Sequence, residues 1–161
     1  MADPKLVSLG DVADFLTGFP FKSADYTDDP SGIRLLRGDN IIQGVLRWQG
    51  VKRWPASLAD QGELYRLIQD DVVLAMDRPW IEAGLKYAAL SDNDCPALLV
   101  QRVTRLRGTD HIDARFLRYV IGGRQFTDYV LAVQTGTAVP HISGGQIKAF
   151  KFLLPDMVEQ R

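Results

Sequence analysis

The sequence predicts an α+β fold, a single domain in which many short β-strands come first and a pair of helices follows. Between residues 33 and 106, apolar residues occur in short runs separated by Gly, Pro and Asp, which is the pattern of short strands joined by turns. After residue 113 the apolar spacing changes to i, i+3, i+4 and i+7, which is typical of amphipathic helices. A chain of 161 residues suits one domain with its own hydrophobic core.

The first part of the chain is predicted to hold a helix, a long loop and a strand. Ser8 can cap a helix with apolar residues on one face as far as Leu16, and Gly18 ends it. Residues 19–32 contain two prolines and few periodic apolar positions, so we expect a long loop, and loops of this length are usually functional or mobile. Residues 33–36 are expected to be a strand.

An aromatic and basic segment follows two short strands that are predicted within residues 41–46. It is expected to be irregular and contains Trp48 and Trp54, with Lys52 and Arg53 between them. Basic residues interleaved with aromatic ones can hold the backbone and bases of a nucleic acid. The alternative interpretation is that the tryptophans close the edge of the core.

Three further strands are predicted in the middle of the chain. Residues 72–76 form an unbroken apolar run typical of a buried strand, and a sharp turn at residues 77–80 leads out of it. Residues 85–90 are the next strand. Residues 97–106 are the longest, and their apolar face shifts within residues 100–103, which indicates a β-bulge.

The C-terminal part is predicted to be helical, with one last strand. Asp113 is expected to cap the first of two amphipathic helices, which are separated by a pair of glycines. The polar loop 135–143 follows, and Ser143 stands three residues before a glutamine, the spacing of a capping box that opens a short helix. Residues 150–154 alternate as in a strand with one buried face. Residues 155–161 look like the start of another helix.

Four stretches in a fixed order carry a family resemblance. Near its end the chain reads GTAVPHIS and then FLLPDMVEQR, and earlier it contains LGDVADFLTGFPFKS, DVVLAMDRPW and ALLVQRVTRLRG. The ordered set covers nearly the whole chain and resembles the target recognition domain of a type I restriction–modification specificity subunit. In that family a loop of the form GT.vphIs, a short helix and an i.lP strand lead into P..EQ, where a long spacer helix begins.

The resemblance implies a domain that recognises double-stranded DNA and has no catalytic centre. In that family a full subunit carries two such domains, each of which recognises one half of a split DNA sequence, and partner subunits supply the methyltransferase and endonuclease activities. We therefore expect a recognition domain at residues 1–154 and a truncated spacer helix at residues 155–161. The chain would be either a fragment or a half-length subunit that pairs with a second copy of itself.

The charge of the chain is informative through its distribution. The formal net charge is −1, which gives no overall attraction to nucleic acid. Residues 102–124, however, contain six arginines and two aspartates, and such a cluster could present one positive face. The alternative is that these arginines are spread around solvated faces.

The sequence motifs of common enzymes are absent. There is no phosphate-binding loop, no nucleophile elbow and no glycine-rich cofactor fingerprint. His111 and His141 are the only histidines, and neither has another ligand at metal-site spacing. We therefore expect no enzymatic activity, no metal and no cofactor. The single cysteine, Cys95, and the lack of a signal or membrane segment suggest a cytoplasmic protein.

Side chains that suit DNA recognition lie mostly in the predicted loops. Arg and Lys suit guanine, Asn suits adenine, and Ser and Thr are more permissive. The candidates are Lys22, Ser23, Asn40, Lys52, Arg53, Arg78, Lys86, Thr137, His141 and Ser143, and the helix start at residues 143–147 could hold a phosphate. Three alternatives stay open: Asn40 is only a turn residue, His141 only braces its own loop, and Arg78 pairs with Asp77 or another carboxylate.

Two other functions remain open. The chain could be the recognition domain of a single-chain restriction–methylation enzyme. It could also be a protein-interaction module, which would be expected to show an exposed apolar patch in place of an arginine-rich face.

Overall fold

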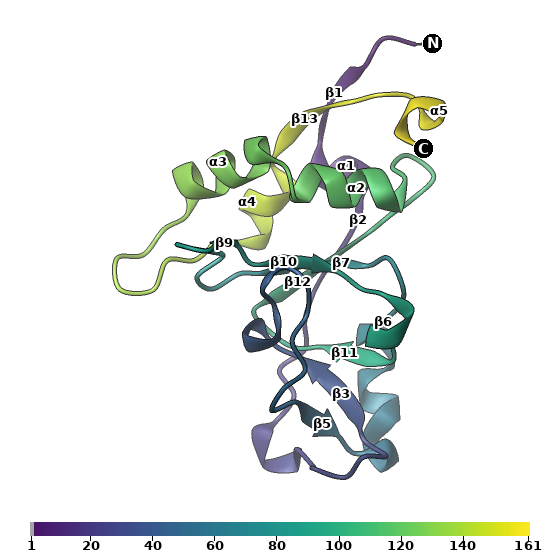
Figure 1. The fold of residues 1–161 in the computed structure, drawn as a ribbon, viewed down its shortest axis with the longest axis vertical. Helices are drawn as coiled ribbons and strands as arrows, with labels where there is room; N and C mark the ends of the chain where they lie inside the picture. The colour runs from purple at the N-terminus through teal and green to yellow at the C-terminus, as the bar shows by residue number, and fades with distance from the viewer. Residues whose placement is uncertain (1) are drawn as a thin grey trace.

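A five-stranded sheet crosses the middle of the molecule in the computed structural model, which describes residues 2–161 (Figure 1). Its strand order is β2 (Asp14–Thr17), β12 (Val103–Arg107), β7 (Val72–Ala75), β10 (Tyr87–Ala89) and β4 (Gln43–Gly44). The pairs are antiparallel except for β10 with β4. Every residue of β7 is buried, so this strand has hydrophobic neighbours on both faces.

A second sheet of four strands lies at the end of the molecule away from the two termini (Figure 1). Its order is β5 (Lys52–Trp54), β3 (Ile33–Leu36), β11 (Ala97–Leu99) and β6 (Arg66–Leu67). The 3₁₀ turns beside the two sheets are η1 (Ser23–Asp25), η2 (Gly38–Asn40), η3 (Ala56–Tyr65) and η4 (Asp92–Asp94). One core cluster, which includes Leu36, Val73 and Leu99, joins the two sheets. Another, which includes Phe21 and Trp54, covers the second sheet.

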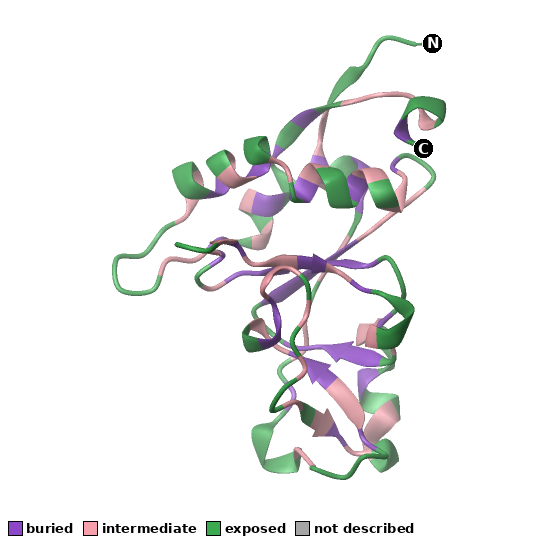
Figure 2. Cartoon of the chain, in the orientation of Figure 1, coloured by how far each residue is buried: buried purple, intermediate pink, exposed green. Residues whose placement is uncertain are grey.

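The helices lie on the other face of the five-stranded sheet. They are α1 (Leu9–Val12), α2 (Ala114–Ile121), α3 (Arg124–Val133) and α4 (Gly144–Lys148). Their inward residues, such as Leu117, Phe126 and Ile147, form the largest core cluster together with Leu74 of β7. Figure 2 shows this division, with buried inner faces and exposed outer faces on α2 and α3. The many strands and few helices confirm the predicted α+β class.

The two ends of the chain meet in a third sheet. Strand β1 (Lys5–Ser8) pairs antiparallel with β13 (Lys151–Leu154), and α5 (Met157–Gln160) follows. The Gln160 side chain accepts a hydrogen bond from the Asp113 backbone N–H at 2.8 Å, which ties this last turn to the start of α2. A small hairpin is formed by β8 (Trp80–Ile81) and β9 (Gly84–Leu85). Met1 lies outside the described residues.

Two sequence predictions about these elements are wrong. The predicted helix as far as Leu16 is a single turn, because residues 14–17 extend and pair with β12 instead. The predicted strand 97–106 with a bulge is two strands, β11 and β12, in two different sheets. The chain changes sheets at residues 100–102, where Arg102 has a φ of 63°. The apparent shift of the apolar face marks this crossing.

Three smaller boundaries also differ. Residues 52–54 are the regular strand β5, not an irregular segment. Within residues 41–46 the strand is β4, and Ile41 and Leu46 meet only as an isolated bridge. The predicted strand 85–90 is interrupted at Lys86, whose backbone N–H donates to the Pro79 carbonyl at 2.7 Å. The predicted strands 33–36, 72–76 and 150–154 and both amphipathic helices are confirmed, although β7 ends at Ala75 and β13 begins at Lys151.

Candidate functional site

The loop between α3 and α4 projects from the side of the molecule and is exposed at its tip (Figures 1 and 2). Its two arms are joined by backbone hydrogen bonds in both directions between Thr135 and His141, at 2.9 and 2.8 Å. Gly136 has a φ of 94°, a backbone conformation that residues with a Cβ atom rarely adopt. The loop therefore has a defined shape although it is exposed.

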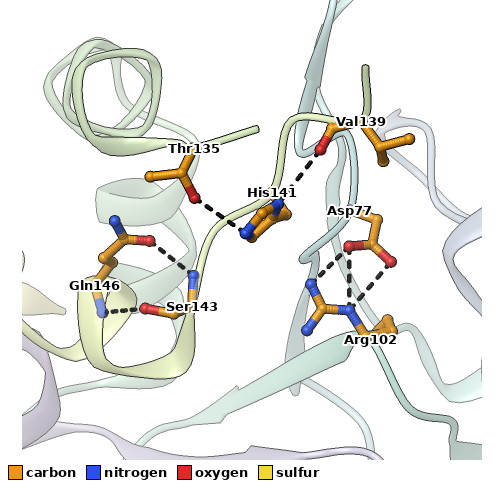
Figure 3. A network of polar contacts seen from close by, with 7 residues as sticks. All are labelled: Asp77, Arg102, Thr135, Val139, His141, Ser143 and Gln146. Atoms are coloured by element: carbon orange, nitrogen blue, oxygen red, sulfur yellow. Dashed lines mark hydrogen bonds and ion pairs between the residues drawn. The ribbon is translucent and has the colours of Figure 1, made fainter. Parts of the chain in front are cut away.

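The His141 ring fixes the inside of this loop (Figure 3). Its Nε2 atom lies 3.0 Å from the Thr135 hydroxyl, and its Nδ1 atom lies 3.3 Å from the Val139 carbonyl oxygen. Because a carbonyl only accepts, Nδ1 carries the proton, and in the neutral ring Nε2 accepts from the hydroxyl. His141 thus braces its own loop, as one of the two interpretations of this residue predicted.

The loop is docked on the turn that follows β7. The buried Ile142 donates its backbone N–H to the Met76 carbonyl at 2.9 Å. The backbone N–H of Arg78 donates to the Pro140 carbonyl at 2.7 Å, and Arg78 has a φ of 46°. The Arg78 side chain is exposed and forms no ion pair among residues 2–161. The backbone of this arginine is therefore anchored while its guanidinium faces solvent.

An ion pair lies beside the docked loop (Figure 3). The Arg102 guanidinium donates to both carboxylate oxygens of Asp77, and the shortest of these hydrogen bonds is 2.6 Å. These bonds hold the pKa of Asp77 below its ordinary value, and the positive charges of Arg102 and Lys86 act in the same direction. The hypothesis that Arg78 pairs with Asp77 is wrong, because Arg102 takes that place.

Ser143 begins helix α4 through the predicted capping box. Its hydroxyl accepts from the Gln146 backbone N–H at 3.1 Å, and its own backbone N–H donates to the Gln146 side chain at 2.8 Å. The Gln146 amide also donates to the Val133 carbonyl at 2.8 Å. This cap connects the end of α3 to the start of α4 and fixes where the loop returns.

The predicted site residues fall into two groups. One group surrounds the loop and the turn after β7, and consists of Arg78, Lys86, Thr137, His141 and Ser143. The other group lies on or near the second sheet, and consists of Lys22, Ser23, Lys52 and Arg53. Asn40 belongs to η2, outside both groups. We call the surface of the first group, together with Asp77 and Arg102, the loop edge.

The second group is less free than the sequence suggests. Lys22, Ser23 and Lys52 are exposed, but the Arg53 guanidinium donates to the Gly32 carbonyl at 2.9 Å. Asn40 is only 3% exposed. Its side chain accepts from the Arg37 backbone N–H and donates to the Arg47 carbonyl. Both ends of the Asn40 amide are therefore used inside the fold.

The two tryptophans of the predicted aromatic segment have structural surroundings. Trp54 is 2% exposed, and its indole N–H donates to the Leu58 carbonyl at 3.0 Å. The indole N–H of Trp48 donates to Asp94 at 2.8 Å, and the Arg34 guanidinium lies 4.6 Å from the centre of the Trp48 ring. These contacts agree with the alternative in which the tryptophans close the core.

The six arginines between residues 102 and 124 do not share one face. Arg102 pairs with Asp77, Arg105 lies 3.1 Å from Asp14, and Arg107 makes two hydrogen bonds to Asp71 at 2.7 and 2.9 Å. Burial lowers the pKa of Arg105, and the nearby charge of Arg107 acts in the same direction. The other three arginines are exposed on helices. Arg115 and Arg118 lie on α2, and Arg124 lies on α3.

The pairing of Asp77 with Arg102 could not be predicted from the sequence. The two residues stand 25 positions apart, and no local pattern connects them. Within residues 2–161, no three His, Cys, Asp or Glu side chains gather where they could hold a metal ion. The same part of the chain has no helix that is both long and apolar enough to cross a membrane.

The chain is similar in sequence to specificity subunits of type I restriction enzymes. It is 37% identical over 157 residues to the type I restriction enzyme EcoAI specificity subunit of Escherichia coli. The aligned region covers 95% of this chain and 26% of that protein. It is 31% identical over 160 residues to the type I restriction enzyme MjaVIII specificity subunit of Methanocaldococcus jannaschii. That aligned region covers 99% of this chain and 37% of that protein. No family model matches the sequence.

Solved structures share the fold at low sequence identity. A chain from a study of the assembly and conformational transition of the type I R-M system superposes with a TM-score of 0.68 at 14% identity, over 99% of this chain and 36% of that one. The HsdS subunit of Thermoanaerobacter tengcongensis gives a TM-score of 0.62 at 16% identity, over 98% and 34%. The fold is therefore that of one part of such subunits.

Fold and sequence together define a class of protein: the chain is related over almost its whole length to type I restriction–modification specificity subunits. More particularly, it matches one target recognition domain of such a subunit, and the resemblance drawn from the sequence motifs is confirmed. The chain spans 26% to 37% of the length of the curated relatives it matches.

Proposed function

We propose that this chain recognises a specific sequence in double-stranded DNA, as the domain that recognises one half of a bipartite site in a type I restriction–modification system. The observation that carries the proposal is the 37% identity to a specificity subunit over 95% of the chain. The loop edge supports it, because a rigid scaffold there presents exposed polar and cationic side chains. Residues 1–154 would form the recognition domain, and α5 would begin the spacer helix.

Within the loop edge, Arg78 is the residue best placed to contact a base. Its backbone is anchored to Pro140. Its side chain is exposed and pairs with no carboxylate among residues 2–161. An arginine in this state can donate two hydrogen bonds to a guanine in the major groove. Thr137 at the exposed tip of the loop would add a permissive contact. Lys86 would contribute charge toward phosphates.

His141 and Ser143 have a supporting role in this proposal. The His141 ring and the Ser143 hydroxyl are both engaged in hydrogen bonds that shape the loop. They would hold Thr137 and Arg78 in place without touching DNA. Asn40 is left out of the base-contacting set because both ends of its amide are used inside the fold. Lys22, Ser23, Lys52 and Arg53 would act as a secondary phosphate-contacting group.

The proposal assigns the chemistry to other proteins. The chain itself would be non-catalytic and would work in the cytoplasm, where it would direct methyltransferase and endonuclease subunits to the DNA. The second half of the site would be recognised by another recognition domain or by a second copy of this chain. Binding by one domain alone is expected to be weak and sensitive to salt, because most of its affinity would come from phosphate contacts.

A selection from a random duplex library tests the proposal directly. The chain is incubated with duplexes that contain a randomised central segment, and the bound fraction is sequenced. We expect enrichment of one short motif. For about 5 neutralised phosphates, the logarithm of the binding constant should fall against the logarithm of salt concentration with a slope of about −4 to −5. Binding that enriches no motif at any salt concentration would contradict the proposal.

A further inference from the structure

A second surface of the molecule is hollowed and lies apart from the loop edge. It is a groove of about 880 Å³ between the junction of α2 and α3 and strand β13, which pass next to each other in Figure 1. Its apolar lining includes Leu6, Phe116, Tyr119 and Leu153. We call it the α2–β13 groove. Nothing in the proposed DNA-recognition function uses it.

The apolar part of this groove is unusually exposed. Leu6 and Leu153 are directly opposite each other in the β1–β13 ladder, and they are 66% and 62% exposed. Tyr119 on the neighbouring helix is 76% exposed, and its ring stacks on that of Phe116 at 6.3 Å between centroids. Contiguous exposed apolar side chains with a charged rim are typical of a protein-binding surface.

The rim of the groove is cationic. Arg115, Arg118, Arg124 and Lys151 line it, and no aspartate or glutamate does. Arg124 lies 3.7 Å from Asp128, but both side chains are largely exposed, so this pair is screened by solvent. The other three form no ion pair among residues 2–161. The chain has 19 basic and 20 acidic residues. A groove whose charged side chains are all positive therefore concentrates positive charge in one place.

We propose that the α2–β13 groove binds an acidic amphipathic helix of a partner protein. An apolar channel between a helix pair and a strand suits the apolar face of a helix, with anchors at helical spacing. The cations on the rim suit carboxylates on the polar face of the same helix. The observation that selects this partner is the charge complementarity: the groove offers three unpaired cations and no carboxylate.

Two other occupants fit less well. A second copy of the chain would bring the same cations together around a twofold axis, and like charges placed opposite each other oppose association. Duplex DNA would suit the cations, but its backbone offers no apolar surface for Leu6 and Leu153 to cover. Protein–DNA interfaces are more polar than interfaces between proteins, so the apolar floor favours a protein partner.

The test uses a defined probe. A fluorescein-labelled 18-residue amphipathic helix, with leucines on one face and glutamates on the other, is titrated with the chain and followed by fluorescence anisotropy. A matched peptide with lysines in place of the glutamates is the control. We expect saturable binding of the acidic peptide and at least tenfold weaker binding of the basic one. NMR shift changes should map to α2, the start of α3 and β13.

Variants decide whether the groove is the binding site. The double variant R118E/K151E should weaken the acidic peptide at least tenfold, and L153S should weaken it with the charge unchanged. R47E, which reverses an exposed cation outside the groove, should leave binding unchanged. Each variant should fold like the parent chain, because Arg118, Lys151 and Leu153 are all exposed. Circular dichroism checks this.

Four results would overturn the proposal. The first is equal binding of the two peptides or no binding of either. The second is shift changes that map elsewhere. The third is a loss of duplex DNA affinity in R118E/K151E as large as that in a loop-edge variant, since this would assign the groove to DNA. Dimerisation that R118E/K151E abolishes, measured by analytical ultracentrifugation, would assign it to a second copy instead.

Discussion

Two groups of arginines that lie close together in the sequence have opposite surroundings in the structure. Arg102, Arg105 and Arg107, on β12 and the turn before it, each lie against a carboxylate: Asp77, Asp14 and Asp71 respectively. Arg115 and Arg118, on α2, point into solvent and pair with nothing among residues 2–161. The strand arginines therefore stabilise the fold, and the helix arginines are free for intermolecular contacts.

The difference shows that cations in a sequence do not by themselves predict a positive surface. A strand in the middle of a sheet places its side chains among those of neighbouring strands, where a charge needs a partner. A helix on the outside of the molecule places its polar side chains in water. Removing a partner of a strand arginine should therefore cost stability, whereas removing a helix arginine should cost only binding.

The largest effect is expected from Asp71→Ala. The Asp71 side chain is fully buried, and its carboxylate accepts two hydrogen bonds from Arg107 and one from the Ile68 backbone N–H at 2.8 Å. Its removal leaves a partly buried guanidinium and an N–H group unpaired, so the free energy of unfolding should fall by about 3 kcal/mol. Urea denaturation measures this value.

The matched control is Glu63→Ala, which removes an exposed ion pair with Arg66. Its cost should be below about 1 kcal/mol. An equal loss in the two variants would mean that burial does not distinguish the strand arginines from those on the surface.

The next effect concerns DNA and should follow Arg78→Ala. If this arginine contacts a guanine, affinity for the selected duplex should fall by about 1–3 kcal/mol and specificity at one base pair should relax. The free energy of unfolding should stay unchanged, since the side chain is exposed and unpaired within residues 2–161. Arg118→Ala is the matched control, and an equal loss of DNA affinity in both variants would remove the proposed distinction between the two surfaces.

Ser143→Ala tests the support of the loop edge. The serine hydroxyl caps α4 by accepting from the Gln146 backbone N–H, and loss of such a cap costs about 1 kcal/mol. Thr137→Ala, at the exposed tip of the same loop, should change the free energy of unfolding by less than about 0.5 kcal/mol. Thermal denaturation of the two variants compares them. Equal losses would show that the capping box contributes little.

The smallest effect is a pH dependence at Asp77. Its pKa is lowered in the folded state, chiefly by hydrogen bonds from Arg102, from the ordinary value of 3.8. A lowered folded-state pKa gives stability that is present above pH 3.8 and is lost as pH falls through the folded value. Both side chains are about half exposed, so the contribution should be below about 1 kcal/mol.

Asp77→Asn removes this titration. Unfolding free energies at pH 7 and pH 3 should therefore differ less in the variant than in the parent chain. A larger difference in the variant would contradict the assigned role of Arg102.

The elements that the sequence predicted well have a local cause. Helix α2 follows from the helical spacing of Leu117 and Ile121, and α3 from that of Phe126 and Val130. The start of α4 follows from the Ser143 capping box. Each signal lies within a few residues of the structure that it predicts. The family motifs likewise identified the class of protein without any knowledge of the fold.

The failures have a long-range cause. Leu16 continues the helical apolar spacing that begins at Leu9, but pairing with β12 makes residues 14–17 a strand. The shift between β11 and β12 resembled a bulge because nothing nearby reveals that the two strands belong to different sheets. The Asp71–Arg107 pair spans 36 positions. Tertiary contacts of this kind also decide which cations of the candidate site remain unpaired. The sequence therefore indicates which residue types could bind DNA, but not which of them are free to do so.

The most direct test of DNA recognition is a domain graft. Residues 1–154 replace the matching segment of the EcoAI specificity subunit, the hybrid is co-expressed with its methyltransferase subunit, and methylated bases are mapped across the genome. We predict a new half-motif beside the unchanged half, and its relaxation at one position in the graft that carries Arg78→Ala. A complex that assembles and keeps its other domain folded, yet methylates no new motif, would contradict the claim that this chain recognises DNA sequence.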